Sequence, residues 1–190
     1  EQVDVVWNAL HGAFGEDGKV QRQFEAFGIP YTGSGVLASA IGMNKELAKE
    51  RFREAGLLTP YGDLISVERD LGDAAFQRFR HGHLPVMVKP AAAGSSVGIT
   101  LAQTFNDLHA AIEKAAQHGD VLIEEYIEGR ELNVTILGER VLPISEITFG
   151  PIFKDKYKIV DFAAKWEKDT QEYKQTVGVC PAKLTPKEQE

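Results

Sequence analysis

The chain has 190 residues, 43% of them apolar, and a formal net charge of −7. These values suit a globular protein with one large or two small domains, and the acidic balance argues against duplex nucleic acid as a partner. A single cysteine excludes an internal disulfide. Without a signal peptide or a long apolar run, we expect a cytoplasmic location and no membrane partner. Because the chain opens on Glu1 rather than Met and stops at Glu190 where a helix begins, we also expect a piece of a longer protein.

The beginning of the chain predicts a fragment of a doubly wound α/β layer. Residues 3–10 are mainly β-branched and apolar, as in a buried parallel strand. The polar turn at residues 11–18 follows at the carboxyl end of that strand, where ligands bind in open α/β sheets. Two helices come next, the first stopped by Gly28 and the second starting at Ser34. Their apolar positions are Val20, Phe24 and Phe27, then Val36, Leu37, Ala40 and Ile41.

A third helix is predicted from Asn44, a good N-cap residue, to Gly56. Its inward positions are Leu47, Ala48, Phe52 and Ala55. Lys45 in the first turn opposes the helix dipole by roughly a few tenths of a kcal/mol, so an anion bound nearby would offset an unfavourable charge. The alternative is a solvated lysine balanced by Glu46.

A short apolar strand at residues 86–88 leads to Lys89 and to a loop of small residues at 91–98. Pro90 disfavours helix at the preceding residue, so the direction of Lys89 is fixed. An ammonium beside such a loop is what a polyphosphate needs, although neither a Walker A nor a G-x-G-x-x-G pattern is present. A hairpin turn with a surface lysine is the alternative.

The loop itself has the composition of an anion cradle. Gly94 and Gly98 can adopt backbone angles closed to other residues, so successive N–H groups can turn inward. Ser95 and Ser96 add hydroxyl donors without bulk.

Further elements flank this loop. A strand at 64–67 and a short helix at 73–79 precede it, and Thr104 caps a helix that Gly119 closes. The inward positions of that last helix are Leu108, Ala111, Ile112 and Ala115. A strand at 121–127 then carries Glu124 and Glu125, which must point to opposite faces, and a surface role for either acid stays open.

The last third of the chain gives weaker signals. Residues 131–137 and 141–147 predict a β-hairpin joined at Gly138 and Glu139. Residues 149–179 show little periodicity and predict a long loop that folds over something. His81 and His83 lack partners at metal-binding spacing, and Ser95 lies in no nucleophile elbow.

Five short motifs, in the same order along the chain, resemble those of the D-alanine–D-alanine ligases of the ATP-grasp superfamily. They are HGAFGEDG at 11–18, YTGSG at 31–35, NK at 44–45, KP with GSSVG at 89–98, and EEYIEGRE at 124–131. The resemblance spans most of the chain and implies an α/β ATP-grasp fold preceded by part of a doubly wound parallel α/β layer. It divides the chain into a remnant of an N-terminal α/β domain at 1–42, a central ATP-grasp subdomain with the phosphate loop at 43–122, and the start of a C-terminal ATP-grasp subdomain with a mobile loop at 123–190.

The resemblance also implies a role for each matching residue. Phosphates of ATP would be bound by Lys45 and Lys89, with Ser95 and Ser96 closing over them. Adenine would lie against Glu124, Glu125 and Ile127, and the ribose hydroxyls against Glu131. Lys165 matches a lysine of a mobile loop that closes on the nucleotide, and it is implied as catalytic together with Ser95, which would also orient the first substrate. His11, Glu16 and Trp166 would lie on the amino-acid side.

The implied reaction makes an amide in peptidoglycan precursor synthesis. ATP converts the carboxylate of D-alanine to an acyl phosphate, and the amine of a second D-alanine displaces phosphate. Mg²⁺ would bridge the phosphates. Its protein ligands are expected beyond residue 190, so the fragment itself is expected to be inactive; a homodimer is an expectation for the full-length protein.

Among the departures from the family pattern, Trp166 stands where the family usually has tyrosine and Val160 where it has an aromatic residue. One alternative function is therefore another ATP-grasp carboxylate–amine ligase with a different second substrate. The other is a non-catalytic nucleotide-binding module.

Overall fold

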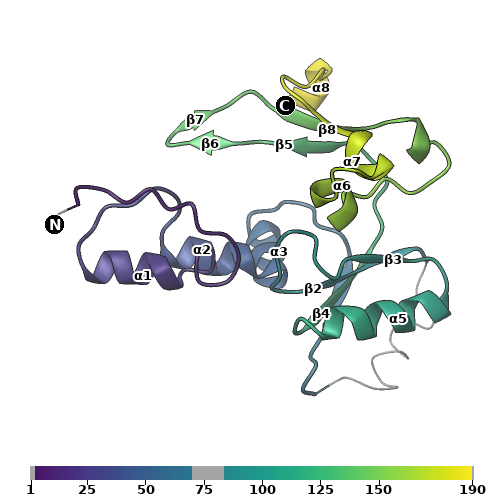
Figure 1. Ribbon diagram of the computed structural model, residues 1–190, viewed down its shortest axis with the longest axis horizontal. Helices are drawn as coiled ribbons and strands as arrows, with labels where there is room; N and C mark the ends of the chain where they lie inside the picture. Colours follow the sequence, from purple (N-terminus) through teal and green to yellow (C-terminus); the bar gives the residue numbers. More distant parts are fainter. Residues whose placement is uncertain (1–2, 70–83, 190) are drawn as a thin grey trace. The chain divides into compact units, whose positions relative to one another are not determined.

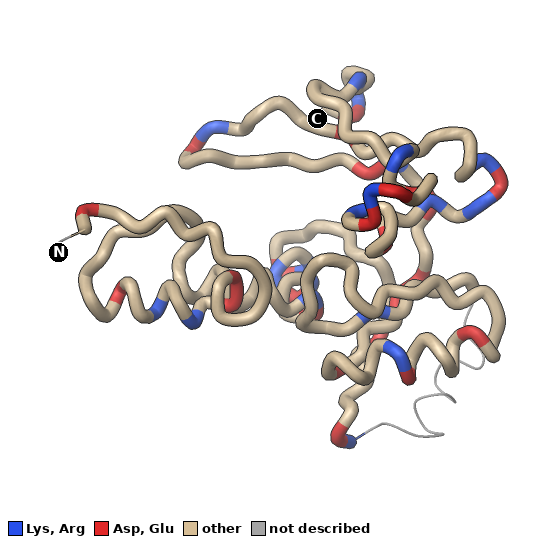
Figure 2. The backbone as a smooth tube through the Cα atoms, in the orientation of Figure 1, with Lys and Arg blue, Asp and Glu red and all other residues tan. Residues whose placement is uncertain are grey.

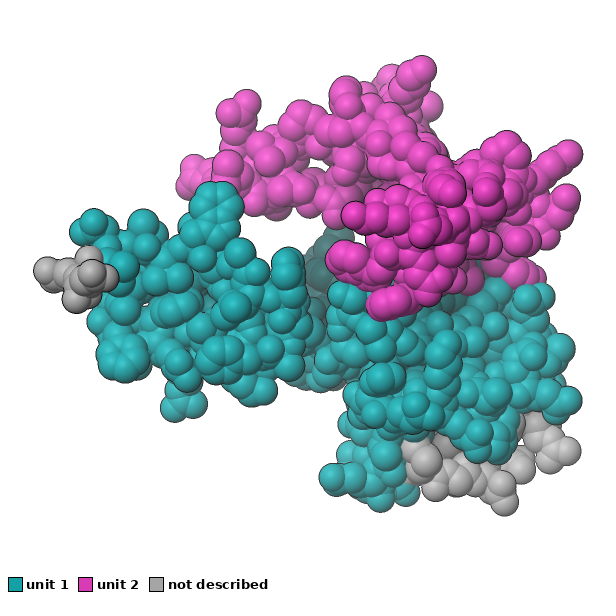
Figure 3. Space-filling view, in the orientation of Figure 1, with its two compact units in different colours: residues 1–126 teal, residues 127–190 magenta. Residues whose placement is uncertain are grey.

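The computed structural model describes residues 3–69 and 84–189, and its elements are labelled in Figure 1. The chain divides into two compact units, Glu1–Tyr126 and Ile127–Glu190 (Figure 3). Among the described residues, no helix is both long and apolar enough to cross a bilayer. The predicted helix at 73–79, together with His81 and His83, lies outside the described residues.

A four-stranded antiparallel sheet is the centre of the first unit. Its strands are β1 (Gly62–Ile65), β4 (Val121–Glu125), β2 (Val86–Pro90) and β3 (Thr100–Ala102), in that spatial order. Helix α5 (Phe105–Ala116) covers one face, with its predicted inward residues Leu108, Ala111, Ile112 and Ala115 all buried. They form the core with strand residues Ile65, Val86, Val88, Ala102, Val121 and Ile123. Strand β1 begins and ends two residues earlier than predicted. It ends at Ile65 because the chain turns there, and the Val67 N–H donates to Asp120 Oδ1 at 2.9 Å instead of to a neighbouring strand.

Helix α5 starts at the predicted cap. The Thr104 hydroxyl accepts the Asp107 N–H at 3.2 Å, and the Asp107 carboxylate accepts the Thr104 N–H at 2.9 Å. This reciprocal capping box satisfies two N–H groups that have no partner inside the helix. Gly119 has a φ of 112°, so the left-handed stop after the helix is also confirmed.

Three helices precede the sheet: α1 (Lys19–Ala26), α2 (Val36–Met43) and α3 (Lys45–Glu54). Gly28 and Gly56 have φ values of 66° and 76° and end α1 and α3 as predicted. The predicted inward faces are partly wrong. Phe27, Leu37, Leu47 and Phe52 are all exposed. In α3 the buried residue is Lys49, because the sheet face that meets this helix carries a carboxylate rather than apolar side chains.

The buried strand predicted at residues 3–10 is wrong. Within the described ranges this segment makes one parallel bridge, Val6 with Tyr31, and Trp7 is 82% exposed. A parallel strand is buried by neighbours on both sides and helices on both faces. The described residues supply one such neighbour, so the apolar sequence stays at the surface.

The second unit contains the predicted hairpin. Strands β6 (Ile136–Leu137) and β7 (Arg140–Val141) pair across the turn at Gly138 and Glu139, while β5 (Glu131–Asn133), β8 (Ser145–Phe149) and β9 (Thr176–Val179) form a second antiparallel sheet in the order β5-β8-β9.

The single long loop predicted at residues 149–179 is wrong. This stretch contains the 3-10 turn η1 (Pro151–Phe153), helices α6 (Phe162–Trp166) and α7 (Gln171–Lys174), and strand β9. Elements of three to five residues are too short to show a period in sequence. Helix α8 (Pro186–Gln189) follows, as the sequence predicted for the end of the chain.

Candidate functional site

Three charged side chains meet on the face of the four-stranded sheet that is turned away from α5. In the antiparallel register Met87 pairs with Glu124 and Lys89 pairs with Leu122, so alternation places Lys89 and Glu124 on the same face. Lys89 Nζ contacts Glu124 Oε2, and Lys49 Nζ lies 2.5 Å from Glu124 Oε1. One carboxylate is therefore shared by two ammonium groups.

These three side chains differ in their access to water. Glu124 and Lys49 are buried, whereas the side chain of Lys89 keeps 22% of its surface exposed. The surface role left open for Glu124 is therefore wrong. With two positive charges and one negative charge, the cluster carries a net charge of +1, and Lys89 is its most accessible member.

Lys45 ties the start of α3 to the phosphate loop. Its backbone N–H donates to the Ala91 carbonyl at 2.9 Å, and its Nζ donates to the carbonyls of Pro90 at 2.9 Å and Ala93 at 2.6 Å. The Asn44 side chain caps the same helix by accepting the N–H of Glu46 at 3.1 Å. A cation in the first turn is thus offset by carbonyl oxygens of the loop, so the solvated lysine of the alternative reading is not what the structure shows.

The backbone of the loop curls at the serines rather than at Gly94. Ser95 and Ser96 have φ values of 54° and 58°, and Gly98 has 71°. Of the two glycines that can adopt such angles, Gly98 has a positive φ and Gly94 does not. Left-handed non-glycine residues are strained and cluster at ligand clamps and active sites. Ser96 is buried, while Ser95 is exposed.

Gly98 is required for space as well as for its backbone angle. A Cβ at this position would lie 2.9 Å from Pro90 Cγ and 3.2 Å from His118 Cδ2. A Cβ at Gly94 would meet nothing within 4 Å. The two glycines, equivalent in sequence, therefore have different structural roles.

The predicted adenine residues lie at the end of β4 and just beyond it. The exposed Glu125 exchanges hydrogen bonds with Tyr61, since its N–H donates to the Tyr61 carbonyl at 2.9 Å and its Oε1 accepts the Tyr61 N–H at 2.8 Å. Ile127 begins the second unit and is 58% exposed. Glu124 and Glu125 point to opposite faces, as predicted.

The turn at residues 11–18 is held by its own side chains. Glu16 Oε2 accepts the N–H of Gly12 at 2.5 Å, and the carbonyl of Gly15 accepts the side-chain amides of Asn8 at 3.1 Å and Gln21 at 2.8 Å. A Cβ at Gly15 would lie 2.4 Å from that of Leu10, so a glycine is needed there. His11 and Glu16 are both exposed on this turn.

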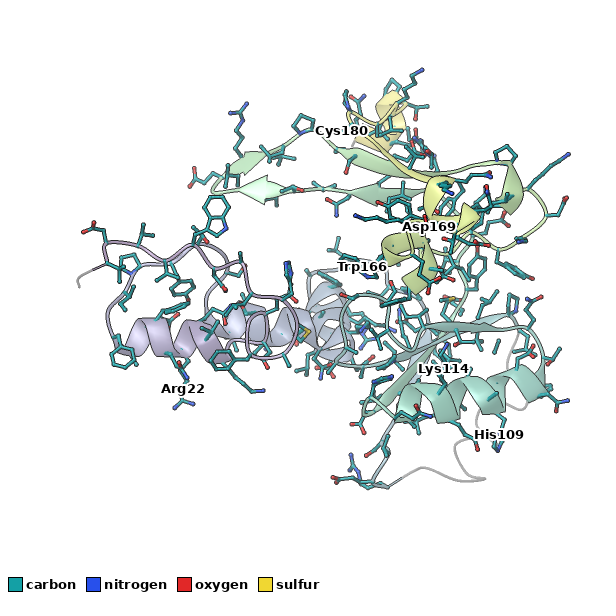
Figure 4. All side chains as sticks on the ribbon, in the orientation of Figure 1. Arg22, His109, Lys114, Trp166, Asp169 and Cys180 are labelled. Carbon is teal, nitrogen blue, oxygen red and sulfur yellow. The ribbon has the colours of Figure 1, made fainter. Side chains whose placement is uncertain are left out.

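In the second unit the structure brings Glu131 and Lys165 within electrostatic range. Burial raises the pKa of the Glu131 carboxyl, and the nearby Lys165 ammonium opposes that shift. Lys165 is on α6, whose first turn is capped by the Asp161 carboxylate through the Ala164 N–H at 2.9 Å. Trp166, labelled in Figure 4, ends this helix with 56% of its surface exposed.

Sequence reasoning missed two charged residues, Lys49 and Arg130. Helix α3 carries charges of both signs (Figure 2), and Lys49 follows Lys45 by four residues. Residues four apart lie on the same face of a helix, so this spacing was a signal that could have identified Lys49. Arg130 holds Glu146 and Glu188 together in the second unit. No local pattern identifies it, because its partners are distant in sequence.

Across residues 3–69 and 84–189, no group of three or more His, Cys, Asp or Glu side chains is arranged to hold a metal ion.

The family model described as D-ala D-ala ligase C-terminus matches residues 38–190, and the model of the N-terminus of the same ligases matches residues 1–34. The chain belongs to the D-alanine–D-alanine ligase family. It is 40% identical over 190 residues to the D-alanine–D-alanine ligase of Pseudoalteromonas translucida and 42% identical over 180 residues to that of Anaeromyxobacter sp. strain K. These alignments include 99% and 91% of the chain, which spans 57% and 54% of the two relatives, or about half their length.

Solved structures of the D-alanine–D-alanine ligase family agree with this assignment. The VanG D-Ala:D-Ser ligase of Enterococcus faecalis matches 100% of the chain and 53% of its own, at 32% identity and a TM-score of 0.78. The D-alanine–D-alanine ligase of Bacillus anthracis complexed with ATP matches 78% of the chain and 49% of its own, at 33% identity and a TM-score of 0.68. The predicted ATP-grasp fold class is confirmed by these neighbours.

Proposed function

We propose that this chain supplies the nucleotide-binding part of an ATP-dependent ligase that joins D-alanine to D-alanine. The observation that carries the proposal is the cluster of Lys49, Glu124 and Lys89 beside a loop that Lys45 fastens from the other side. A net positive cluster at a strained glycine–serine loop suits a polyphosphate. Membership of the ligase family and a relative complexed with ATP support the same reading.

The chemistry follows from the low reactivity of a carboxylate. One carboxylate oxygen attacks the γ-phosphorus of ATP, the bond to ADP breaks, and an acyl phosphate forms. The amine of the second amino acid then attacks the carbonyl carbon, phosphate leaves with the C–O bonding pair, and the amine loses a proton. The protein contributes charge neutralisation, alignment and exclusion of water rather than a nucleophile.

In this proposal the site residues are divided between the nucleotide and the amino acids. Phosphates contact Lys45, Lys89, Ser95 and Ser96; adenine contacts Glu124, Glu125 and Ile127; ribose contacts Glu131. Lys165 acts on the nucleotide, and His11, Glu16 and Trp166 act on the amino acids. Ser95 also orients the first substrate. The lysines lower the charge repulsion between the phosphates and the attacking carboxylate.

We also propose Mg²⁺ as a companion of the nucleotide, a cytoplasmic location and a homodimer for the full-length protein.

A second candidate is a ligase with the same first substrate and a different second amino acid. The exposed Trp166 at the end of α6, where the family usually has tyrosine, favours it. The match to a D-Ala:D-Ser ligase at a TM-score of 0.78 points to D-serine as that second amino acid.

ADP release by the full-length protein tests the proposal. We expect release that depends on D-alanine and is absent with L-alanine, and a dipeptide product whose second residue is identified by mass spectrometry in competition between D-alanine and D-serine. A product ending in D-serine selects the second candidate. No D-amino-acid-dependent release at any substrate concentration contradicts both.

A further inference from the structure

Lys49 is a buried cation to which the proposed reaction assigns no task. It is 6% exposed on a helix that leaves the apolar side chains Leu47 and Phe52 at the surface. Hydrophobic burial therefore does not explain why this face of α3 turns inward. Its Nζ lies 2.5 Å from Glu124 Oε1 and 4.0 Å from Glu46 Oε2, and Glu46 is itself paired with Arg53 at 2.7 Å.

Stability alone is a poor reason for such a pair. Two charges taken out of water lose hydration that their mutual attraction repays only in part, and apolar replacements of buried ion pairs are often as stable. Stability alone therefore does not account for the pair.

The charges around Glu124 point to a task for Lys49. Lys89 and Glu124 by themselves cancel, so they would offer no net attraction to an anion. Lys49 adds the second positive charge and leaves the cluster at +1. The surplus resides on the exposed side, because Lys89 has 22% of its side chain accessible while Lys49 and Glu124 have 7% and 4%.

We propose that Lys49 is a positioning residue of the nucleotide site, which neutralises Glu124 so that Lys89 presents a positive charge to a nucleotide phosphate. This inference rests on the proposed nucleotide site. When a phosphate draws the Lys89 ammonium toward itself, Lys49 remains as the partner of Glu124, and no unpaired carboxylate is left in a buried position. Lys49 itself touches neither substrate nor nucleotide.

Calorimetric titration of the full-length protein with ATP and, separately, with adenosine tests the proposal. In Lys49→Met we expect ATP affinity to fall at least about tenfold and adenosine affinity to fall clearly less, because the change at Glu124 affects both ligands while only phosphates need the surplus charge. Lys49→Arg keeps the charge and should stay within about threefold of wild type. Arg51→Met is the matched control, because it removes an exposed cation from the same helix. It should change neither affinity.

A second pair of variants covers the case in which Lys49→Met does not fold. Glu124→Gln removes the carboxylate that Lys49 neutralises, so adding Lys49→Met to it should lower ATP affinity by less than about threefold, a non-additive pattern for residues in contact. A further tenfold loss in the double variant overturns the proposal. So does a Lys49→Met protein that binds ATP as wild type does, or that loses ATP and adenosine equally.

The wild-type titration separates this inference from the function it rests on. If wild type does not bind ATP, the proposed nucleotide site is wrong. If wild type binds ATP and Lys49→Met leaves that affinity unchanged, the nucleotide site stands and the role of Lys49 is wrong.

Discussion

The guanidinium of Arg130 holds the carboxylate of Glu146 with two hydrogen bonds, 2.8 Å from Nε and 2.7 Å from Nη2. The same group reaches Glu188 in α8 at 2.6 Å and the Lys183 carbonyl at 2.8 Å, so one side chain links β8 to the last helix. Arg130→Lys keeps the charge but cannot form the planar fork. We expect a lower urea midpoint for the second unit.

The control for this variant is Arg51→Lys. Arg51 bonds Glu54 at 2.6 Å on the exposed side of α3, within a single helix, so its replacement should leave the midpoint unchanged. Equal shifts in the two variants would show that the Arg130 cluster stabilises nothing.

The same cluster predicts how stability depends on pH. Two hydrogen bonds from Thr185 and one from Arg130 lower the pKa of Glu188 from 4.5 to about 2. A carboxylate whose pKa is lowered on folding stabilises the protein above its unfolded pKa, and that stabilisation is lost as pH falls. The loss therefore occurs between pH 4.5 and about 2.

Glu188→Gln removes this titration. Between pH 6 and pH 3 the urea midpoint should fall further for wild type than for the variant. The surface variant Glu54→Gln should show the same fall as wild type. A variant as acid-sensitive as wild type would refute the assignment.

The two glycines of the phosphate loop give a matched pair of substitutions. Gly98→Ala forces a side chain into a left-handed position against Pro90, so we expect a loss of about 1–2 kcal/mol in the free energy of unfolding, together with weaker ATP binding. Gly94→Ala meets open space and should change both quantities little. Chemical denaturation and ATP titration measure the two effects, and a reversed ranking would contradict the loop geometry.

Local signals in the sequence predicted the elements whose causes are local. Thr104 and Asp107 are three residues apart, and their capping box forms as expected. The hairpin at Gly138 is likewise set by its turn residues. The prediction of a buried strand at residues 3–10 was wrong because burial of a strand depends on neighbouring strands and helices, which the sequence of the strand itself does not specify.

In the candidate site, too, residues with local signals were predicted and residues placed by distant contacts were not. Lys45 and Lys89 were singled out by local signals, namely a cation in the first turn of a helix and a lysine fixed by Pro90 beside a loop of small residues, and the family motifs then gave them and Glu124 their roles. Those roles and the three-part domain division remain predictions. Lys49 was missed because its burial follows from contact with Glu124, which lies on a strand distant in sequence. The loop composition indicated backbone angles that glycine favours, and Gly98 does have a positive φ, but the other two positive φ values in the loop are at Ser95 and Ser96 rather than at Gly94.

Calorimetric titration of ATP into wild type, Lys89→Ala and Lys89→Arg tests the central claim most directly. If Lys89 binds a phosphate, the alanine variant loses a charge-assisted contact worth roughly 1.5–3 kcal/mol, which lowers the affinity for ATP about tenfold to a hundredfold. The arginine variant should recover part of that loss, because a planar guanidinium fits a crowded loop less well than a compact ammonium. Equal ATP affinity in all three proteins would contradict the account, because the loop beside Lys89 would then hold no phosphate.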